Sequence, residues 1–98
     1  MIFEILQGIG LPCAYSHFRN KQTLPYLVYT GDGQDTMAAD NTWYYRKNTY
    51  QIEYYFKEKD EEVEAAIEDT LLDSGYQYEK SDDVYINDQD CYVIYYNI

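Results

Sequence analysis

Apolar residues in the middle of the chain first alternate with polar ones and then change to a helical spacing. Between Thr49 and Lys57 every second residue is apolar, namely Tyr50, Ile52, Tyr54 and Phe56. That period of two predicts a strand with one apolar face. After Lys59 the apolar set follows the spacing of an amphipathic helix, at Val63, Ala66, Ile67, Thr70 and Leu71. The pattern predicts a helix that folds back to cover the apolar face of the strand.

Local signals define the ends of this unit. Thr42–Lys47 and Thr49–Lys57 are predicted to form a hairpin with its turn at Lys47-Asn48, because Asn tolerates the left-handed backbone of tight turns. Asp60 is predicted to cap the start of the helix, and Gly75 to end it in a left-handed conformation.

The remaining segments predict short elements around this unit. A short helix is expected at Ile2–Gln7, ended by Gly8 and Gly10. Further strands are predicted at Cys13–Phe18, Tyr26–Thr30, Tyr76–Lys80, Val84–Ile86 and Cys91–Ile98. Gly31–Asn41 is rich in Gly, Asp and Asn and has no periodic pattern, so it is predicted to be a long loop.

These elements predict one α+β domain spanning residues 1–98. Its expected architecture is an antiparallel sheet of about four to six strands, with one long and one short helix packed on one face. The final strand is apolar on both sides, with Cys91, Val93 and Tyr95 facing one way and Tyr92, Ile94, Tyr96 and Ile98 the other. Because two helices of about 10 Å diameter cover only one face, the other face is expected to stay partly exposed and to serve in assembly.

The net charge of −11 comes from the end of the chain. Acids and bases balance at six each through Lys59, whereas from Asp60 onward twelve acids face only Lys80. Such a surface repels phosphate, so specific nucleic-acid binding is not expected. Whether the acidic half is simply a solvated face or acts through its field stays open. The 14 tyrosines suit both strands and interfaces.

The inventory of reactive side chains predicts neither an enzyme nor a metal or cofactor site. His17 is the only histidine, and no nucleophile or acid partner is placed near it by the sequence. Asp32, Asp35 and Asp40 lack the ligand register of a calcium loop. We therefore expect no catalytic residues and no cofactor.

The cysteines and the hydropathy pattern favour a reducing cytoplasm. Cys13 and Cys91 form no local motif, so their pairing stays open, and we predict that both are structural thiols. The apolar segment MIFEILQGIG contains Glu4 and has no basic region, so no export signal is predicted. No apolar run approaches the ~20 residues of a membrane helix, and no membrane partner is expected.

The order of segments along nearly the whole chain is similar to that of a known family. The segments are GLPCAYSHF (10–18), LPYLVYTGDGQDTMAADNTWYY (24–45), YQIEYYFKEKDEEVEAAIEDTLLDSGYQYEKSD (50–82) and CYVIYYNI (91–98). With a short helix, a Gly-Pro break, a long loop, a hairpin, an acidic helix and a terminal strand, the chain resembles the tail-terminator and head–tail joining proteins of long-tailed phages and prophages. None of these segments is a catalytic signature.

This resemblance implies a structural protein of virion assembly. Six copies would form a ring that ends the tail tube and joins it to the capsid, so the expected partners are the chain itself, the major tail tube protein and the head–tail connector protein. The expected location is the virion tail or neck, after assembly in the host cytoplasm. Tyr55, Tyr96 and Ile98 are candidate interface residues on the exposed sheet face. Met37 and Asp40 are candidate contacts in the long loop.

Two other functions are compatible with the composition. Twelve acids among the last residues would suit a phage-encoded inhibitor that mimics nucleic acid, although tyrosine and isoleucine alternate with those acids. An acidic mimic would bind a basic host enzyme with strong salt dependence. A tail-fibre or capsid-decoration subunit is a further alternative.

Overall fold

The computed structural model describes residues 2–39 and 43–98, and of residues 35–39 and 43–47 it describes the backbone alone. The helices and strands in these ranges are α1 (Ile2–Gln7), β1 (Cys13–Tyr15), β2 (Tyr26–Ala39), β3 (Trp43–Phe56), α2 (Glu61–Asp73), β4 (Glu79–Lys80), β5 (Val84–Ile86) and β6 (Cys91–Asn97). The predicted α+β class, with one long and one short helix, is confirmed.

The strands of the described residues form one sheet in the order β1-β2-β3-β6-β4, and β5 also pairs with β6. β1 runs parallel to β2, with Cys13 opposite Leu27, while the other pairs are antiparallel. The sheet thus departs from the predicted antiparallel arrangement in one pair. The cause is the segment 16–25, which carries the chain back to the end where β1 began instead of turning tightly.

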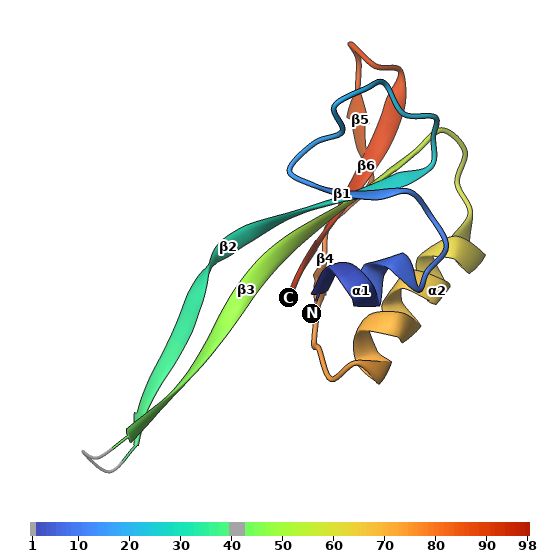
Figure 1. The fold of residues 1–98 in the computed structure, drawn as a ribbon. Coiled ribbons are helices and arrows are strands. Elements are labelled where there is room, and N and C mark those ends of the chain that lie inside the picture. The colour runs from blue at the N-terminus through green and yellow to red at the C-terminus, as the bar shows by residue number, and fades with distance from the viewer. Residues whose placement is uncertain (1, 40–42) are drawn as a thin grey trace.

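Both helices lie on the same side of the sheet (Figure 1). Their buried side chains meet the inward side chains of the strands in one cluster, which comprises Ile2, Leu6, Leu27, Ile52, Tyr54, Phe56, Ile67, Leu71, Ile94, Tyr96 and Ile98. We call this side of the sheet the front face and the opposite side the back face. The alternation predicted for Thr49–Lys57 is confirmed, because Ile52, Tyr54 and Phe56 are buried in the front-face core.

The ends of α2 follow the local signals in the sequence. The Asp60 carboxylate accepts hydrogen bonds from the N–H groups of Glu62 at 3.1 Å and Val63 at 3.4 Å, which satisfies free donors of the first turn. At the other end Gly75 has φ +88°, a left-handed conformation that a residue with a Cβ rarely adopts. Both predicted caps are confirmed.

β2 and β3 extend far beyond the rest of the sheet as a two-stranded arm. Figure 1 shows the pair projecting from the helix-covered body, and the molecule measures 51 × 25 × 24 Å. We define the arm as residues 31–39 and 43–49, whose ladder runs from Gly33 opposite Thr49 to Ala39 opposite Trp43. A β-bulge separates the arm from the body between Gly31 and Gly33, where Gly33 has φ +109°.

The arm corrects two predictions. The predicted loop Gly31–Asn41 is strand as far as Ala39, while residues 40 and 41 lie outside the described residues. The predicted turn at Lys47-Asn48 is wrong, because β3 runs through both residues, and Asn48 pairs with Gln34 across the arm. The hydrogen bond from Gln34 Nε2 to Asn48 Oδ1, at 2.9 Å, shows how two polar residues support a strand pair that the local composition does not indicate.

Other boundaries differ by smaller amounts. The predicted strands Cys13–Phe18 and Tyr76–Lys80 shorten to β1 and to the two residues of β4. β1 ends where Ser16 has φ +66°, because this backbone conformation is not extended. Tyr26–Thr30 lengthens into β2. The predictions for α1 and β5 are confirmed, and β6 ends one residue earlier than predicted.

Candidate interaction surfaces

The arm has no third strand along it in the part of the chain that the structure describes. The last backbone contacts of β6 with β3 are the reciprocal hydrogen bonds between Tyr50 and Ile98, at 3.0 and 3.2 Å. On the other edge, β1 pairs with β2 only as far as Tyr29, followed by one hydrogen bond from the Ser16 N–H at 2.8 Å. An isolated two-stranded ribbon is only marginally stable in water, and its open edges favour pairing with another chain. The arm is therefore a candidate contact surface.

The back face carries a second apolar layer that the helices do not cover. Val28, Cys91 and Val93 are buried there, and Tyr55 is half-buried. This layer follows from the confirmed two-sided character of β6. Ile94 and Tyr96 enter the front-face core, so Cys91 and Val93 point to the back face. Segment 16–25 folds over part of the back face, so this face is less exposed than predicted.

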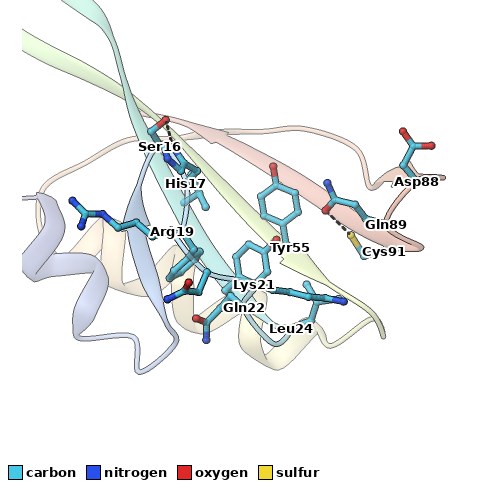
Figure 2. A pocket seen from close by; sticks show the side chains of 14 residues that line it. Ser16, His17, Arg19, Lys21, Gln22, Leu24, Tyr55, Asp88, Gln89 and Cys91 are labelled. Carbon is cyan, nitrogen blue, oxygen red and sulfur yellow. Dashed lines mark hydrogen bonds between the residues drawn. The ribbon is translucent and has the colours of Figure 1, made fainter.

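A pocket of about 580 Å³ lies between this loop and the turn before β6. Figure 2 shows Tyr55 at its centre, with the loop residues on one side and Gln89 and Cys91 on the other. Tyr26 stacks on Tyr55 with ring centroids 5.0 Å apart, so the floor of the pocket is largely aromatic. The pocket combines this apolar floor with polar loop residues at its rim.

Two basic residues, Arg19 and Lys21, line the rim of the pocket. In Figure 2 Lys21 lies across the pocket below Tyr55, whereas Arg19 points outward. Neither forms an ion pair with any described residue, although Lys57, Lys59 and Lys80 all do. The pocket also has one carboxylate, Asp88, so its rim carries a net positive charge within a chain of net charge −11.

The titratable groups at the pocket floor favour their neutral forms. Burial raises the pKa of Tyr55, and the hydrogen bond that its hydroxyl donates to Glu53 at 2.5 Å raises it further. Burial also raises the pKa of the Cys91 thiol. The floor thus supplies an apolar surface and no nucleophile at neutral pH.

The cysteines are both free. Cys91 is 1% exposed, while Cys13 is half-buried against the front-face core. Burial raises the pKa of Cys13 to about 11, so it stays protonated at neutral pH. Both behave as small apolar groups with unreactive thiols.

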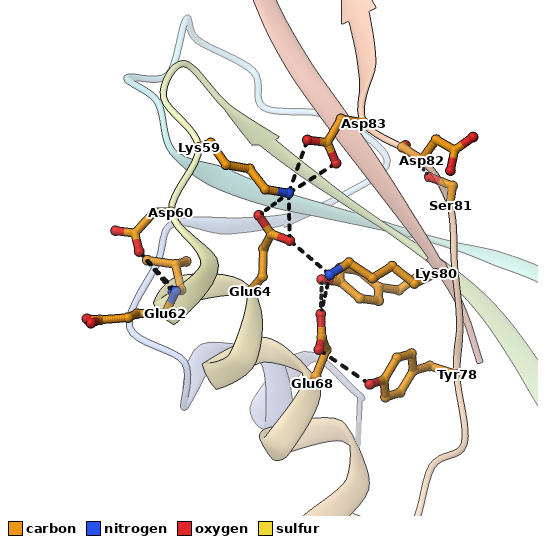
Figure 3. Close-up of polar contacts among 12 residues, drawn as sticks. Lys59, Asp60, Glu62, Glu64, Glu68, Tyr78, Lys80, Ser81, Asp82 and Asp83 are labelled. Carbon is orange, nitrogen blue, oxygen red and sulfur yellow. Dashed lines mark hydrogen bonds and ion pairs between the residues drawn. The ribbon is translucent and has the colours of Figure 1, made fainter.

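A cluster of charged residues, which we call the Glu64 cluster, joins α2 to the segment around β4 (Figure 3). Glu64 is 2% exposed and lies 2.8 Å from both Lys59 Nζ and Lys80 Nζ. Lys59 also pairs with Asp83 at 3.0 Å, and Lys80 with Glu68 at 2.8 Å. Burial alone would raise the pKa of Glu64, but the hydrogen bonds from the two lysines outweigh it and the pKa is lowered.

The Glu64 cluster extends into the front-face core through tyrosine hydroxyls. Tyr96 donates a hydrogen bond to Glu68 Oε2 at 2.8 Å, and Tyr78 donates one to Glu68 Oε1 at 3.4 Å. Burial raises the pKa of Tyr96, and the Glu68 carboxylate adds to that effect. Each charged group of the Glu64 cluster contacts at least one group of opposite sign, so the cluster is suited to holding the fold together.

The structure changes the role of the predicted interface residues. Tyr96 is fully buried and Ile98 is 8% exposed, both under the helices, so the prediction that they face a neighbour is wrong. The choice of face was inverted, because the helices cover the side of β6 that carries Ile94 and Tyr96. Tyr55 does lie on the back face, in the pocket floor. Met37 belongs to β2 with its side chain not described, and Asp40 lies outside the described residues.

No specific pattern along the chain indicates the pocket. Arg19 and Lys21 stand between two predicted strands, in a segment without a predicted element. Tyr26 and Tyr55 are 29 positions apart along the chain. The only available sign was that these two bases have no acid within several residues. The absence of nearby acids in the sequence does not indicate which strand the loop packs against after folding.

Comparison with known proteins adds no assignment: no protein-family model matches the chain, and no curated protein matches it significantly. Among the described helices none has the length and apolar character needed to cross a membrane. Within residues 2–39 and 43–98 no three His, Cys, Asp or Glu side chains gather as a metal site would require.

Proposed function

We propose that this protein is a structural subunit of a phage particle, which assembles head to tail with copies of itself into a ring at the end of the tail tube. The observation that carries this proposal is the arm. A ribbon with two open edges, extending well beyond the core, gains stability by lying against another chain. A subunit with a compact body and a long arm can reach its neighbour in a ring.

The placement of the surfaces supports a closed assembly. The arm and the back-face pocket differ from the helix-covered front face. If one of these surfaces of a copy binds a different surface of the next copy, the contact is head-to-tail. Such contacts form rings when the rotation between subunits closes and filaments when it does not. A tail terminator requires the closed form, since it must stop a growing tube.

The distribution of acids is compatible with a ring through which DNA passes. Asp60, Glu64, Glu68, Asp83 and Asp90 make internal contacts, while exposed carboxylates such as Glu61, Glu62 and Asp82 make no ion pair among the described residues. Exposed carboxylates repel phosphate, so a DNA strand would not adhere to such a ring.

The acidic-mimic alternative receives less support. A mimic needs its carboxylates in outward rows, but five of the twelve acids from Asp60 onward cap a helix or pair with lysines of the same chain. These contacts give the acids a role in folding. The ring subunit is therefore the better proposal.

The direct test is a null allele in a phage or prophage that carries this gene. We expect electron micrographs of lysates to show over-long or unjoined tails beside filled, tailless heads. Expression of the wild-type chain in trans should restore normal particles. Tails of normal length joined to heads in the null would overturn the proposal.

A further inference from the structure

The pocket and one exposed face of α2 have complementary charge, and each carries apolar surface. The pocket offers an apolar floor with two unpaired bases at the rim, Arg19 and Lys21. On α2, Leu72 is 53% exposed, and it stands between two exposed acids, Asp69 and Asp73. Neither acid forms an ion pair with a described residue. We call Asp69, Leu72 and Asp73 the acidic knob.

The position of the acidic knob on the helix strengthens the match. α2 has no basic residue in its last turn, so the negative end of its dipole is not compensated within the helix. A cation supplied by another chain is favoured at that end. Arg19 and Lys21 are cations of this kind, and both are free to make such a contact.

We propose that the pocket of one copy receives the acidic knob of the next copy, with Leu72 on the aromatic floor and Asp69 and Asp73 beside Lys21 and Arg19. This inference rests on the proposed function, since it adds a second contact between neighbouring subunits of the ring to the contact made by the arm. α2 covers the front face and the pocket lies on the back face, so the contact joins unlike surfaces and repeats from subunit to subunit.

Charge-swapped variants test the contact as a matched set. Arg19→Glu/Lys21→Glu makes the pocket rim acidic, and Asp69→Lys/Asp73→Lys makes the knob basic. Each variant alone should self-associate at least tenfold more weakly than the wild type in sedimentation at low salt, because like charges would meet. A mixture of the two variants, or all four changes in one chain of wild-type net charge, should recover association to within a few-fold of the wild type.

Two controls separate the contact from folding and from bulk charge. Lysine near the end of a helix is favourable, so the knob variant should keep its helical circular dichroism and its denaturation midpoint. Glu4→Lys/Glu79→Lys changes the net charge by the same amount at two exposed sites outside both surfaces, and it should not weaken association. Equal weakening by this control, or no weakening by either swap, would overturn the interface.

Zero-length cross-linking gives a readout even where association is weak. A carbodiimide joins a lysine amine to a carboxylate in contact with it, and a mixture of ¹⁴N- and ¹⁵N-labelled protein identifies links between chains. We expect mixed-isotope peptides joining Lys21 to Asp69 or Asp73. Their absence at millimolar protein would overturn the interface. A terminator defect in the null phage without these cross-links would support the proposed function and overturn the interface. Normal tails in the null phage together with these cross-links would support the interface and overturn the proposed function.

Discussion

Lys80 Nζ donates a hydrogen bond to Glu64 Oε1 at 2.8 Å, and this contact ties the middle of α2 to the two-residue strand β4. β4 has only two ladder partners on β6, so its position depends on side-chain contacts more than on the ladder. Because Glu64 is almost fully buried, its charge also depends on the two lysines that reach it.

Glu64→Gln is expected to destabilise the fold markedly. The change keeps the shape of the side chain but leaves two lysines without their shared anion. Removing one partner of a buried pair costs roughly 3–5 kcal/mol, and the partial exposure of both lysines reduces this to about 2 kcal/mol. Denaturant unfolding measures the change. Glu62→Gln, at an exposed site of the same helix, is the matched control and should change stability by less than about 0.5 kcal/mol. Equal effects of the two changes would show that the Glu64 cluster adds no stability.

The Glu64 cluster also predicts a loss of stability in acid. The contacts with Lys59 and Lys80 lower the pKa of Glu64 below its ordinary value of 4.5. The contact with Lys80, together with the Tyr96 hydroxyl, likewise lowers the pKa of Glu68. A carboxyl whose folded pKa is lowered contributes stability above its unfolded pKa and loses it as the pH falls through the folded value. We therefore expect the free energy of unfolding to be constant near pH 7 and to decrease below pH 4.5.

The matched experiment for this pH dependence compares the wild type with Glu64→Gln/Glu68→Gln. The variant lacks both titrating groups, so its free energy of unfolding should start lower and decline less steeply in acid. Parallel pH profiles of the two proteins would mean that other carboxylates cause the acid loss.

Features set by neighbouring residues were predictable from the sequence, and those set by distant pairing were not. Asp60 and Gly75 act on the backbone within three residues, so the caps of α2 were correct. The arm depends on pairing across the hairpin, where Gln34 meets Asn48, and its glycines and aspartates locally suggest a loop. Composition describes local preference, but the ladder partner decides whether a polar segment becomes a strand.

The face of a two-sided strand is a second limit. Residues of β6 are apolar on both sides, so the alternation alone does not say which set the helices will cover. Tyr96 was predicted to face outward for this reason, and its hydroxyl is in fact satisfied inside by Glu68. The pocket depends on a loop packing against a strand distant in sequence, which no periodicity reveals.

Shortening the arm separates its role from that of the body. Replacing residues 34–48 with Asn-Gly joins Gly33 to Thr49, which face each other in the ladder, by a two-residue hairpin turn. The identified core lies in the body, so the free energy of unfolding should change by less than about 1 kcal/mol. Because the shortened chain lacks the open edges that we assign to the neighbouring subunit, it should fail to rescue the null phage.

The full-length control keeps the arm and changes one residue on it. Asn48→Ser removes the amide that accepts from Gln34, and it should still rescue the null, because the ladder and the length of the arm remain. Unfolding of the shortened chain would show that arm and body form one cooperative unit, contrary to the prediction that the body is stable without the arm. Rescue by a folded, shortened chain would show that the arm is not the contact that closes the ring, since its open edges are what the neighbouring subunit would cover.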